Sequence, residues 1–351
     1  DPFVGHRAIE QKIGAPSSVQ GPAGAPFPFL TSSNDLLDHR AIDLLNLAAC
    51  DQTRCAIMRG NMKAIVCGSY GSPEVLVLKE VPKPSPRDNE LLIRVNATSV
   101  TAGEVRLRKP DPFAVRFAFG LTKPKYPILG VVLAGVVEAV GANVTRYKPG
   151  DKVFGSAGMT FGTYAEYVYV SEDATLAAMP PEMSFEQAAA IPFGGTTALW
   201  FLRKGNIQSG DSVLIYGASG AIGTSAVQLA KHFGAHVTGV CSTVNLEMVR
   251  SLGADTVIDY MAGEMTFPEG SFDIVFDTVG ESPFAACVRA LKENGKYLRS
   301  VHMRPADIIR GAWVSFTTGK KVIGGVISET ADDMAFLRDL VEAGSLKPVI
   351  D

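Results

Sequence analysis

Residues 212–223 have the composition and spacing of a phosphate-binding turn. An apolar run at residues 213–216 ends at Gly217, and two more glycines follow at Gly220 and Gly223. The apolar residues that come next have the spacing of one helix face: Ile222, Ala226, Leu229, Ala230 and Phe233. Backbone N–H groups at such a helix start are unpaired, and the helix dipole favours an anion there. We expect a cradle in which a side chain on Gly220 or Gly223 would hold a pyrophosphate or the packed helix too far away.

A glycine triplet alone also fits a plain strand–turn–helix crossover, so its surroundings matter. Further apolar strand candidates lie at residues 236–240, 256–259, 272–278, 296–301 and 321–326. Helical patterns separate most of them, at residues 245–252, 282–292 and 331–342. Six short strands that alternate with helices predict a doubly wound parallel sheet of the α/β class. In that unit, the glycine turn predicts dinucleotide binding.

The segment that follows the second strand bears on the choice of cofactor. NAD-binding units usually place an acid about 20 residues beyond the glycine turn, on the ribose hydroxyls, but residues 239–245 contain none. Hydroxyls of Ser242 and Thr243 have the chemistry to donate to a 2′-phosphate, which an acid would repel. NADPH is therefore the predicted cofactor. The alternative role of the two hydroxyls is helix capping before Asn245.

Composition excludes several classes of partner. The chain has 351 residues, 46% hydrophobic and 20% charged, with a net charge of −3 and no basic run. This predicts two globular domains and argues against nucleic acid or an anionic membrane surface as a partner. The longest apolar stretch, residues 128–140, is too short to span a bilayer. Five scattered cysteines indicate reduced thiols, and hence a cytoplasmic location.

The chain divides into three parts. Residues 1–61 differ in composition from the rest of the chain. Residues 14–28 are rich in Gly, Ala, Pro and Ser, which predicts flexibility, and residues 36–49 fit a short amphipathic helix. We interpret this part as a partly disordered extension ahead of an ancestral start at Met62. Residues 62–184 predict a β-rich, partly open barrel. Its strand candidates are residues 63–66, 75–81, 90–97, 134–140, 152–154 and 163–170.

One connection inside the barrel domain is unusually long and apolar. Residues 107–125 carry Phe113, Phe117 and Phe119. A long apolar connection within a compact domain is often a binding loop. A small helix that closes the barrel is the other interpretation, and the sequence does not decide between them.

From Met62 onward, several segments resemble one known family in their order and spacing. They are residues 62–64, 127–130, 134–141, 149–153, 188–198, the glycine turn, 252–255 and 276–280. The chain is similar to the medium-chain dehydrogenase/reductase superfamily, and within it to the zinc-independent quinone oxidoreductase branch that includes zeta-crystallin. The resemblance implies a GroES-like domain at residues 62–184 and a Rossmann domain at residues 185–327, with NADPH between them. It also implies that residues 328–351 return to the first domain without the family's last helix and strand, and that the chain is a homodimer.

Zinc-using relatives hold their metal with Cys, His and Glu, ligands that zinc needs at short range. This chain has no cysteine between Cys67 and Cys241 and no histidine between His39 and His232. The place of the zinc enzymes' Gly-His-Glu reads Gly130-Val131-Val132, and the cysteine cluster of a structural zinc lobe is absent. We expect no metal, and therefore no Lewis-acid activation of an alcohol.

The resemblance also assigns site residues. The cofactor-binding set is Thr197, Gly217, Ser219, Gly220, Ala221, Ile222, Gly223, Ser242, Thr243, Tyr260, Thr278 and Val279. Thr197, Thr278 and Val279 match positions near the nicotinamide, and Tyr260 matches a residue against the adenosine half. Tyr260 also fits a half-buried strand tyrosine, and Val244 stands where close relatives often carry Arg. Catalytic candidates are Thr101 and Glu104, at a polar pair that faces the nicotinamide, and Tyr126 as a proton donor or a packing residue.

These assignments predict a hydride transfer from NADPH to a quinone or an α,β-unsaturated carbonyl. Such acceptors take hydride without a metal because the charge delocalises onto oxygen, while the protein orients and shields the cofactor. An enoyl-thioester reductase is an alternative in the same superfamily. A weakly catalytic NADPH-binding protein with a structural or redox-sensing role is an alternative of a different class.

Overall fold

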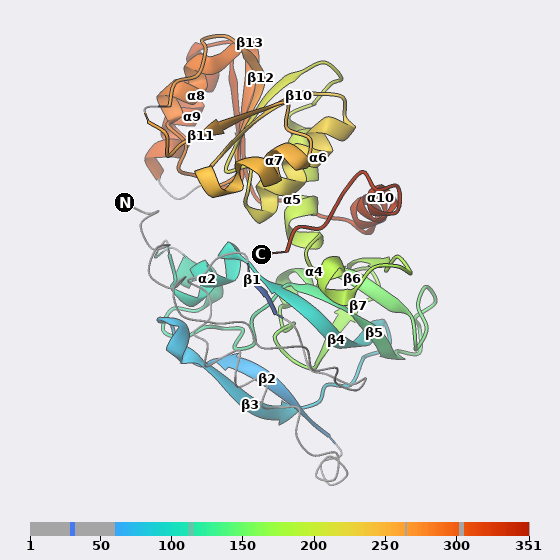
Figure 1. The fold of residues 1–351 in the computed structure, drawn as a ribbon. Helices are drawn as coiled ribbons and strands as arrows, with labels where there is room; N and C mark the ends of the chain where they lie inside the picture. The colour runs from blue at the N-terminus through green and yellow to red at the C-terminus, as the bar shows by residue number, and fades with distance from the viewer. Residues whose placement is uncertain are drawn as a thin grey trace, which may run out of the picture.

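The computed structural model describes residues 29–31, 60–111, 113, 115–263, 265–301 and 305–350. They form two lobes, a β-rich lobe and an α/β lobe, which Figure 1 shows one below the other. The helix expected at residues 36–49, like most of the proposed extension, lies outside the described residues. Of that extension, the structure describes strand β1 (Phe29–Thr31) and the residues from Gly60 onward.

The β-rich lobe contains a six-stranded sheet and a separate hairpin. The sheet runs in the order β1, β4 (Glu90–Val100), β5 (Val132–Val140), β6 (Lys152–Ser156) and β8 (Thr175–Ala178), and β7 (Tyr167–Ser171) also pairs with β4. All pairs in it are antiparallel except β1 with β4. The hairpin consists of β2 (Asn61–Cys67) and β3 (Leu76–Pro82). Short helices are η3 (Pro73–Val75), α2 (Ala102–Arg108), α3 (Val115–Phe119) and η4 (Gly158–Thr160).

Apolar residues on the inner faces of these strands close the lobe around its own core. Leu91, Ile93 and Val95 alternate along β4, as expected for side chains that point to one face of a strand, and all three are buried. They pack with Leu133 and Val153 of the neighbouring strands in one cluster. This is the predicted GroES-like, partly open barrel.

The α/β lobe has a six-stranded parallel sheet in the order β11-β10-β9-β12-β13-β14. Its strands are β9 (Ser212–Tyr216), β10 (His236–Cys241), β11 (Thr256–Asp259), β12 (Phe272–Asp277), β13 (Leu291–Arg299) and β14 (Lys321–Gly324). The helices are α6 (Ala221–His232), η5 (Thr243–Asn245), α7 (Leu246–Ser251), α8 (Phe284–Ala290) and α9 (Pro305–Thr317). The doubly wound order confirms the predicted α/β class, and β9 and β12 flank the point where the strand order reverses.

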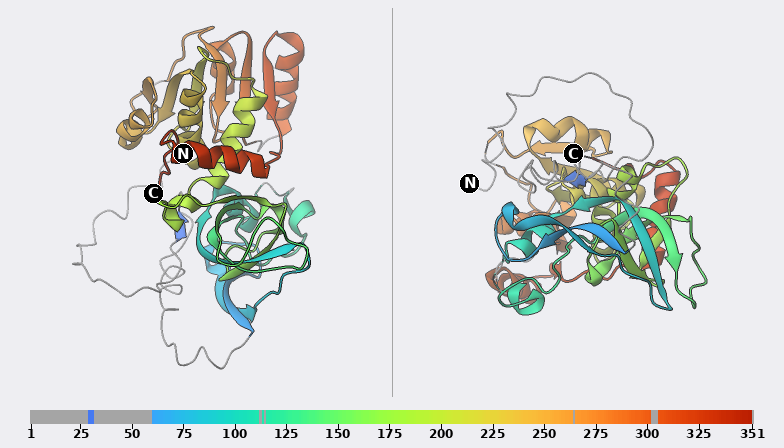
Figure 2. Two further views of the ribbon diagram at one scale, coloured as in Figure 1. Left: turned by 90° about the vertical axis from the view of Figure 1, so that its right-hand side faces the viewer. Right: turned by 90° about the horizontal axis from the view of Figure 1, so that it is seen from below.

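Two helices and the C-terminal segment join the lobes. They are α4 (Phe185–Ala189), α5 (Pro192–Lys204) and α10 (Ala331–Glu342), with α10 lying between the lobes in Figure 2. One apolar cluster includes Ala134 and Phe154 of the barrel together with Ile215 of the parallel sheet and Leu337 of α10. Gln228 of α6 also bonds in both directions with the backbone of Lys347. The two lobes therefore share a continuous core.

Several predicted elements need correction. The helix expected at residues 282–292 ends at Ala290, because Leu291 already pairs with Phe272 and begins β13. The strand expected at residues 163–170 begins only at Tyr167, since Ala165 forms just an isolated bridge with Ala64. Elements that were not predicted include β1, which pairs with β4 although it lies in the proposed extension, as well as α2, α4, α5, α9 and β8. None of the helices in the described part of the chain has both the length and the apolar character to cross a membrane.

Candidate functional site

The glycine turn leaves the carboxyl end of β9 at the point where the strand order reverses. Gly217 and Ala218 both donate their N–H to the Val240 carbonyl, at 3.0 and 2.9 Å, and this ties the turn to the next strand. Gly217 has a φ of +80°, a left-handed conformation that glycine adopts without steric cost. The chain therefore reverses tightly and enters α6 directly above the sheet.

The three glycines differ in what surrounds them. A Cβ on Gly217 would lie 2.2 Å from Val279 Cγ2, and one on Gly223 would lie 2.0 Å from the Gly217 carbonyl oxygen. A Cβ on Gly220 would meet nothing closer than that same oxygen at 3.6 Å, and Gly220 is exposed. Gly217 and Gly223 are thus required by packing, whereas Gly220 borders open space where a ligand can approach the backbone.

The first turn of α6 carries the predicted anion-binding groups. Its N-cap is Gly220, which has no side chain to cap the helix, and the first intrahelical bond runs from Thr224 N to the Gly220 carbonyl at 2.8 Å. The amides of Ala221, Ile222 and Gly223 belong to the turn whose N–H groups find no intrahelical acceptor. Ser219, Ala221 and Ile222 are all partly exposed. This arrangement fits the diphosphate of a dinucleotide.

Two further cofactor candidates sit on the loop after β12, against the glycine turn. Thr278 Oγ1 donates to the carbonyls of Tyr216 and Gly217, at 2.8 and 3.1 Å. Val279 is the residue that a Cβ on Gly217 would strike. The structure therefore brings Thr278 and Val279 into contact with the glycine turn.

A buried carboxylate, which sequence reasoning did not single out, fixes this loop. Asp277 Oδ1 accepts from the N–H groups of Val279 and Gly280, at 3.1 and 2.7 Å, and its Oδ2 accepts from Ser282 Oγ at 2.7 Å. Arg299 Nε lies 3.8 Å from Oδ2, and both side chains are almost fully buried. The signal that predicts this role is an Asp at a strand end that precedes a Gly-containing turn.

Thr197 comes from the helix that packs beside α6. It is buried in α5, one turn after Gly194, whose Cβ position lies only 2.0 Å from the Ala221 carbonyl oxygen. This close approach sets α5 directly against the start of α6. Thr197 thus belongs to an element that touches the glycine turn.

The remaining cofactor candidates gather where β10 and β11 end. Asn245 Nδ2 donates to Ser242 Oγ at 3.1 Å, and Thr243 Oγ1 donates to Asp259 Oδ2 at 2.6 Å. Neither Ser242 nor Asn245 forms a side-chain cap for the helix that follows it, so the capping role considered for this segment is not seen. Tyr260 is half-buried next to Asp259, and its N–H donates to the Cys241 carbonyl at 3.2 Å.

Thr101 and Glu104 form the N-terminal capping box of α2 in the barrel lobe. Glu104 Oε2 accepts from the N–H and from the hydroxyl of Thr101, and Oε1 accepts from Val131 N at 3.2 Å. Glu104 is only 3% exposed. Burial raises the pKa of its carboxyl group, and the bonds from Thr101 and Val131 act in the opposite direction. Both oxygens are therefore held by protein donors.

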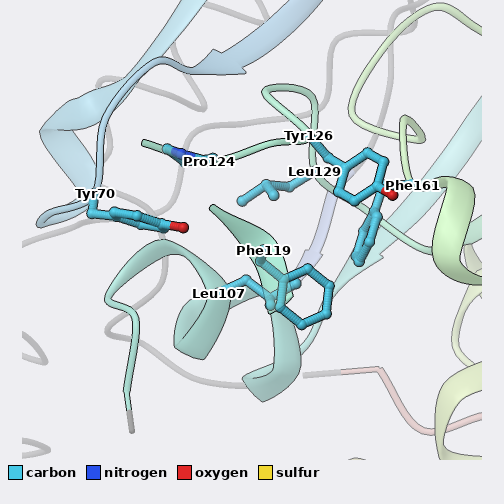
Figure 3. Close-up of a pocket in the computed structure, with 7 residues that line it drawn as sticks. All are labelled: Tyr70, Leu107, Phe119, Pro124, Tyr126, Leu129 and Phe161. Atoms are coloured by element: carbon cyan, nitrogen blue, oxygen red, sulfur yellow. The ribbon is translucent and has the colours of Figure 1, made fainter. Parts of the chain in front are cut away.

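Tyr126 lines an apolar pocket, with Leu107 of α2 on its wall (Figure 3). The pocket is small, with a cavity volume of about 10 Å³, and its walls are Tyr70, Leu107, Phe119, Pro124, Tyr126, Leu129 and Phe161. The Phe161 ring lies 5.2 Å from that of Tyr126 and 5.9 Å from that of Phe119. Phe161 is buried with a φ of +54°, a conformation that costs a residue other than glycine about 1–3 kcal/mol.

The long connection thus contains a helix and also lines a pocket. Residues 115–119 form α3, and Phe119 faces the pocket while Phe117 is 75% exposed and Phe113 67% exposed. The small helix expected as one interpretation is present as α3, and a binding role for residues 107–125 stays a prediction. Tyr126 packs against Phe161, whereas Thr101 and Glu104 bond to each other at the start of α2, so the three catalytic candidates form one pair and one separate residue.

The donor set for a metal is sparse. Within residues 60–111, 115–263 and the other described ranges, no three His, Cys, Asp or Glu side chains lie close enough together to hold a metal ion. Gly130, Val131 and Val132 offer no ligating side chain. Cys67, Cys241 and Cys287 are free and buried.

Comparisons with known proteins agree with this architecture. Residues 87–181 match the alcohol dehydrogenase GroES-like domain, and residues 221–300 match the zinc-binding dehydrogenase family. The 2-methylene-furan-3-one reductase of Solanum lycopersicum is 33% identical over 317 residues, which cover 87% of this chain and 75% of that protein. The chloroplastic NADPH-dependent alkenal/one oxidoreductase of Arabidopsis thaliana is 32% identical over 318 residues, with the same coverage.

A solved structure agrees as well. The quinone oxidoreductase from Coxiella burnetii is 31% identical and superposes with a TM-score of 0.72, over 82% of this chain and 89% of that chain. The resemblance inferred from the sequence is confirmed by these matches. The chain belongs to the medium-chain dehydrogenase/reductase superfamily, in its quinone oxidoreductase branch.

Proposed function

We propose that this oxidoreductase transfers a hydride from NADPH to a quinone or an α,β-unsaturated carbonyl without a metal. The observation that carries the proposal is the exposed Gly220 backbone at the start of α6, at the reversal point of the parallel sheet. The relatives support it, since they are named reductases of furanones, alkenals and quinones. The comparisons support a nicotinamide-dependent oxidoreductase. NADPH as the specific cofactor, the class of the acceptor and the roles of the residues are our proposal.

The protein's part in binding falls to the glycine turn and its neighbours. Amides from Ser219 to Ile222 would hold the diphosphate, with Gly217 and Gly223 keeping the turn and helix close together. Thr278, Val279 and Thr197 would border the nicotinamide end, and Ser242, Thr243 and Tyr260 the adenosine end. When bound, the nicotinamide supplies the hydride, and the protein supplies orientation and shielding.

The barrel lobe would hold the acceptor. The aromatic rings of Tyr126 and Phe161 offer an apolar surface for a quinone or enone, because ring faces pack well against planar conjugated molecules, and the small pocket beside them would open to admit the acceptor. Thr101 and Glu104 are proposed to fix the start of α2, and Glu104, held by three donors, acts as a positioning residue. Tyr126 is the proposed source of the proton that neutralises the reduced acceptor, since it lines the pocket and carries a hydroxyl group.

The donor set supports metal-free chemistry. Zinc catalysis needs three protein ligands with an open fourth position, and the family's usual ligand place reads Gly130-Val131-Val132 in this chain. A conjugated acceptor does not require a Lewis acid, because its oxygen takes up the negative charge as the hydride arrives. Addition of a chelator is therefore expected to leave turnover unchanged.

We propose that the chain works as a homodimer in the cytoplasm. The support for a dimer is an exposed apolar stripe on α9, beside the outermost strand β14: Ile309, Trp313 and Phe316 are 70%, 68% and 89% exposed. The support for the location is the scattered cysteines, three of which are buried free thiols. The Arabidopsis relative is named chloroplastic, so fractionation of the source cell is the direct test of location.

Single-turnover oxidation of NADPH tests the proposed reaction. In separate experiments, the enzyme with stoichiometric NADPH is mixed with a benzoquinone, a conjugated enone or an enoyl thioester. In a further experiment, the enzyme with NADP⁺ is mixed with a simple alcohol. The proposal expects rapid loss of the NADPH absorbance with the quinone or the enone and none of the reverse reaction with the alcohol. Oxidation by the enoyl thioester alone would favour the thioester reductase, and binding without oxidation by any acceptor would favour the weakly catalytic alternative.

A further inference from the structure

An acidic side chain lies at the adenosine end of the proposed cofactor site, although the local sequence contains none. Asp259 is the last residue of β11 and pairs in register with Cys241, the last residue of β10. Its Oδ2 accepts from Thr243 Oγ1 at 2.6 Å, and its Oδ1 accepts from Met261 N at 2.8 Å. The carboxylate is therefore fixed beside the segment that follows β10.

The segment after β10, about 20 residues beyond the glycine turn, decides which ribose a Rossmann unit binds, and Asp259 contacts that segment from the next strand. An acid there bonds to the 2′-hydroxyl of NAD, whereas a cation accommodates the 2′-phosphate of NADP. Residues 242–245 have no acid of their own, but the fold supplies one from the neighbouring strand. Since Thr243 directs its hydroxyl proton to Asp259, that proton is not directed at a phosphate.

The guanidinium of Arg250 is the charge that opposes this carboxylate near the end of β10. Burial and the Asp259 carboxylate raise the pKa of the Cys241 thiol to about 11 against the lowering effect of Arg250, so both charges act on the end of β10. Arg250 is exposed on α7. A phosphate at the ribose would be repelled by the Asp259 carboxylate, where the ribose hydroxyl of NADH would meet an acceptor.

We propose that Asp259 is a specificity-determining residue, whose carboxylate keeps the affinity for NADPH within about tenfold of the affinity for NADH. The inference rests on the proposed function, because it assumes that the dinucleotide lies along the glycine turn. It adds that the preference for NADPH is shallow and that one residue sets it. Removing the charge frees the site to favour the phosphate.

The test compares the dissociation constants of NADPH and NADH, measured by fluorescence titration on the full chain. Asp259→Asn removes the charge and keeps the shape, and it is expected to raise the preference for NADPH roughly tenfold. Thr243→Val is the second variant: it leaves the carboxylate without its donor and should lower the preference for NADPH.

Asp255→Asn is the matched control. Asp255 precedes β11 at its other end, about 13 Å away along the strand, where it pairs with Lys231 at 2.8 Å. Asp255 carries the same charge as Asp259 but lies at the far end of the strand. Its loss should therefore leave the preference for NADPH unchanged. An unchanged preference in Asp259→Asn, or one that Asp255→Asn reproduces, would overturn the inference and leave the proposed function intact. Failure of the wild type to bind either nucleotide would instead overturn the proposed function.

Discussion

At the scale of single residues, the glycines of the turn after β9 separate folding from binding. A Cβ on Gly223 would lie 2.0 Å from the Gly217 carbonyl oxygen, while one on Gly220 would lie 3.6 Å from the same oxygen. A methyl group at one position therefore disturbs the packing of the turn. At the other it occupies only the volume that a ligand needs.

We predict that Gly220→Ala folds normally and binds NADPH roughly tenfold more weakly. The φ of Gly220 is −78°, which alanine adopts freely, so only the N-cap preference is lost, at about 1 kcal/mol or less. Thermal unfolding and fluorescence titration check the two parts separately. Undiminished affinity would mean that nothing approaches the backbone at this residue.

Gly223→Ala is the matched comparison, because it adds the same methyl group three residues away. It is expected to destabilise the fold by about 1–3 kcal/mol, since the new Cβ also lies 2.7 Å from Ala218 Cα. Chemical denaturation measures this loss. A fully stable Gly223→Ala variant would show that α6 does not pack on the turn as described.

The buried thiols predict a loss of stability in alkali. Burial raises the pKa of Cys287 from 9.0 to about 11, so the folded state favours the neutral thiol. The stabilisation is fully present below pH 9 and is lost as the pH rises through about 11, because only the unfolded chain releases the proton in that range. Cys287→Ala should remove about 2–3 kcal/mol of this pH dependence. Denaturation of both proteins from pH 8 to pH 11 checks it; a stability difference that is constant with pH would contradict it.

At the scale of elements, the capping boxes explain how short helices form in the barrel lobe. α2 has only seven residues, too few to be stable alone. Glu104 pairs with Thr101 at its start and also reaches Val131 in the segment before β5. The Glu104 carboxylate thus caps the start of α2, directly after β4, and links both elements to the segment before β5.

We predict that Glu104→Ala costs about 2–4 kcal/mol, because it leaves several buried donors without an acceptor. Glu104→Gln, which retains one acceptor oxygen, should cost about half as much and keep most of the turnover if the residue only positions α2. The control is Gln187→Ala in the exposed capping box of α4 with Ser184, where water replaces the lost bond at about 1 kcal/mol. Urea denaturation of the three variants, with a pH–rate profile for Glu104→Gln, separates a structural from a catalytic loss.

The elements that the sequence predicted well are those with a clear period. The six strands of the parallel sheet were all expected, because each is an apolar run between polar turns, and α10 was expected from its periodicity. By contrast, α5 and α9 were missed although each has a proline near its start, Pro192 and Pro305, which is a helix-start signal. The capping boxes at Thr101 and Ser184 were also available as signals for α2 and α4.

The site was predictable where it depends on local sequence and not where it depends on pairing between strands. The glycine turn is recognisable from twelve consecutive residues. Asp259 reaches Thr243 only because β11 lies beside β10, a contact between residues 16 positions apart. For the same reason the sequence could not show that Arg299 approaches Asp277 from the next strand.

At the scale of the whole molecule, two lobes share one core and leave one apolar edge uncovered. Ile309, Trp313 and Phe316 recur at the spacing of one helix face on α9. A stripe of large exposed apolar side chains marks an interaction surface. A second copy of the chain is the proposed occupant.

We predict that Trp313→Glu with Phe316→Glu converts a dimer into a monomer, because burying two carboxylates in an apolar interface is strongly unfavourable. Light scattering after gel filtration reports the mass directly. The control is Met159→Glu, at a residue that is 65% exposed on the barrel lobe, which should leave the dimer intact. A wild type that is monomeric at all concentrations would contradict the proposed assembly.

The most direct test of the account is a crystal structure of the chain with NADPH. We expect the diphosphate oxygens to accept hydrogen bonds from the backbone amides of residues 219–222, with the nicotinamide beside Thr278 and Val279 and the adenosine ribose beside Thr243. A dinucleotide bound away from the start of α6, or a crystal soaked to saturation that holds none, would contradict it.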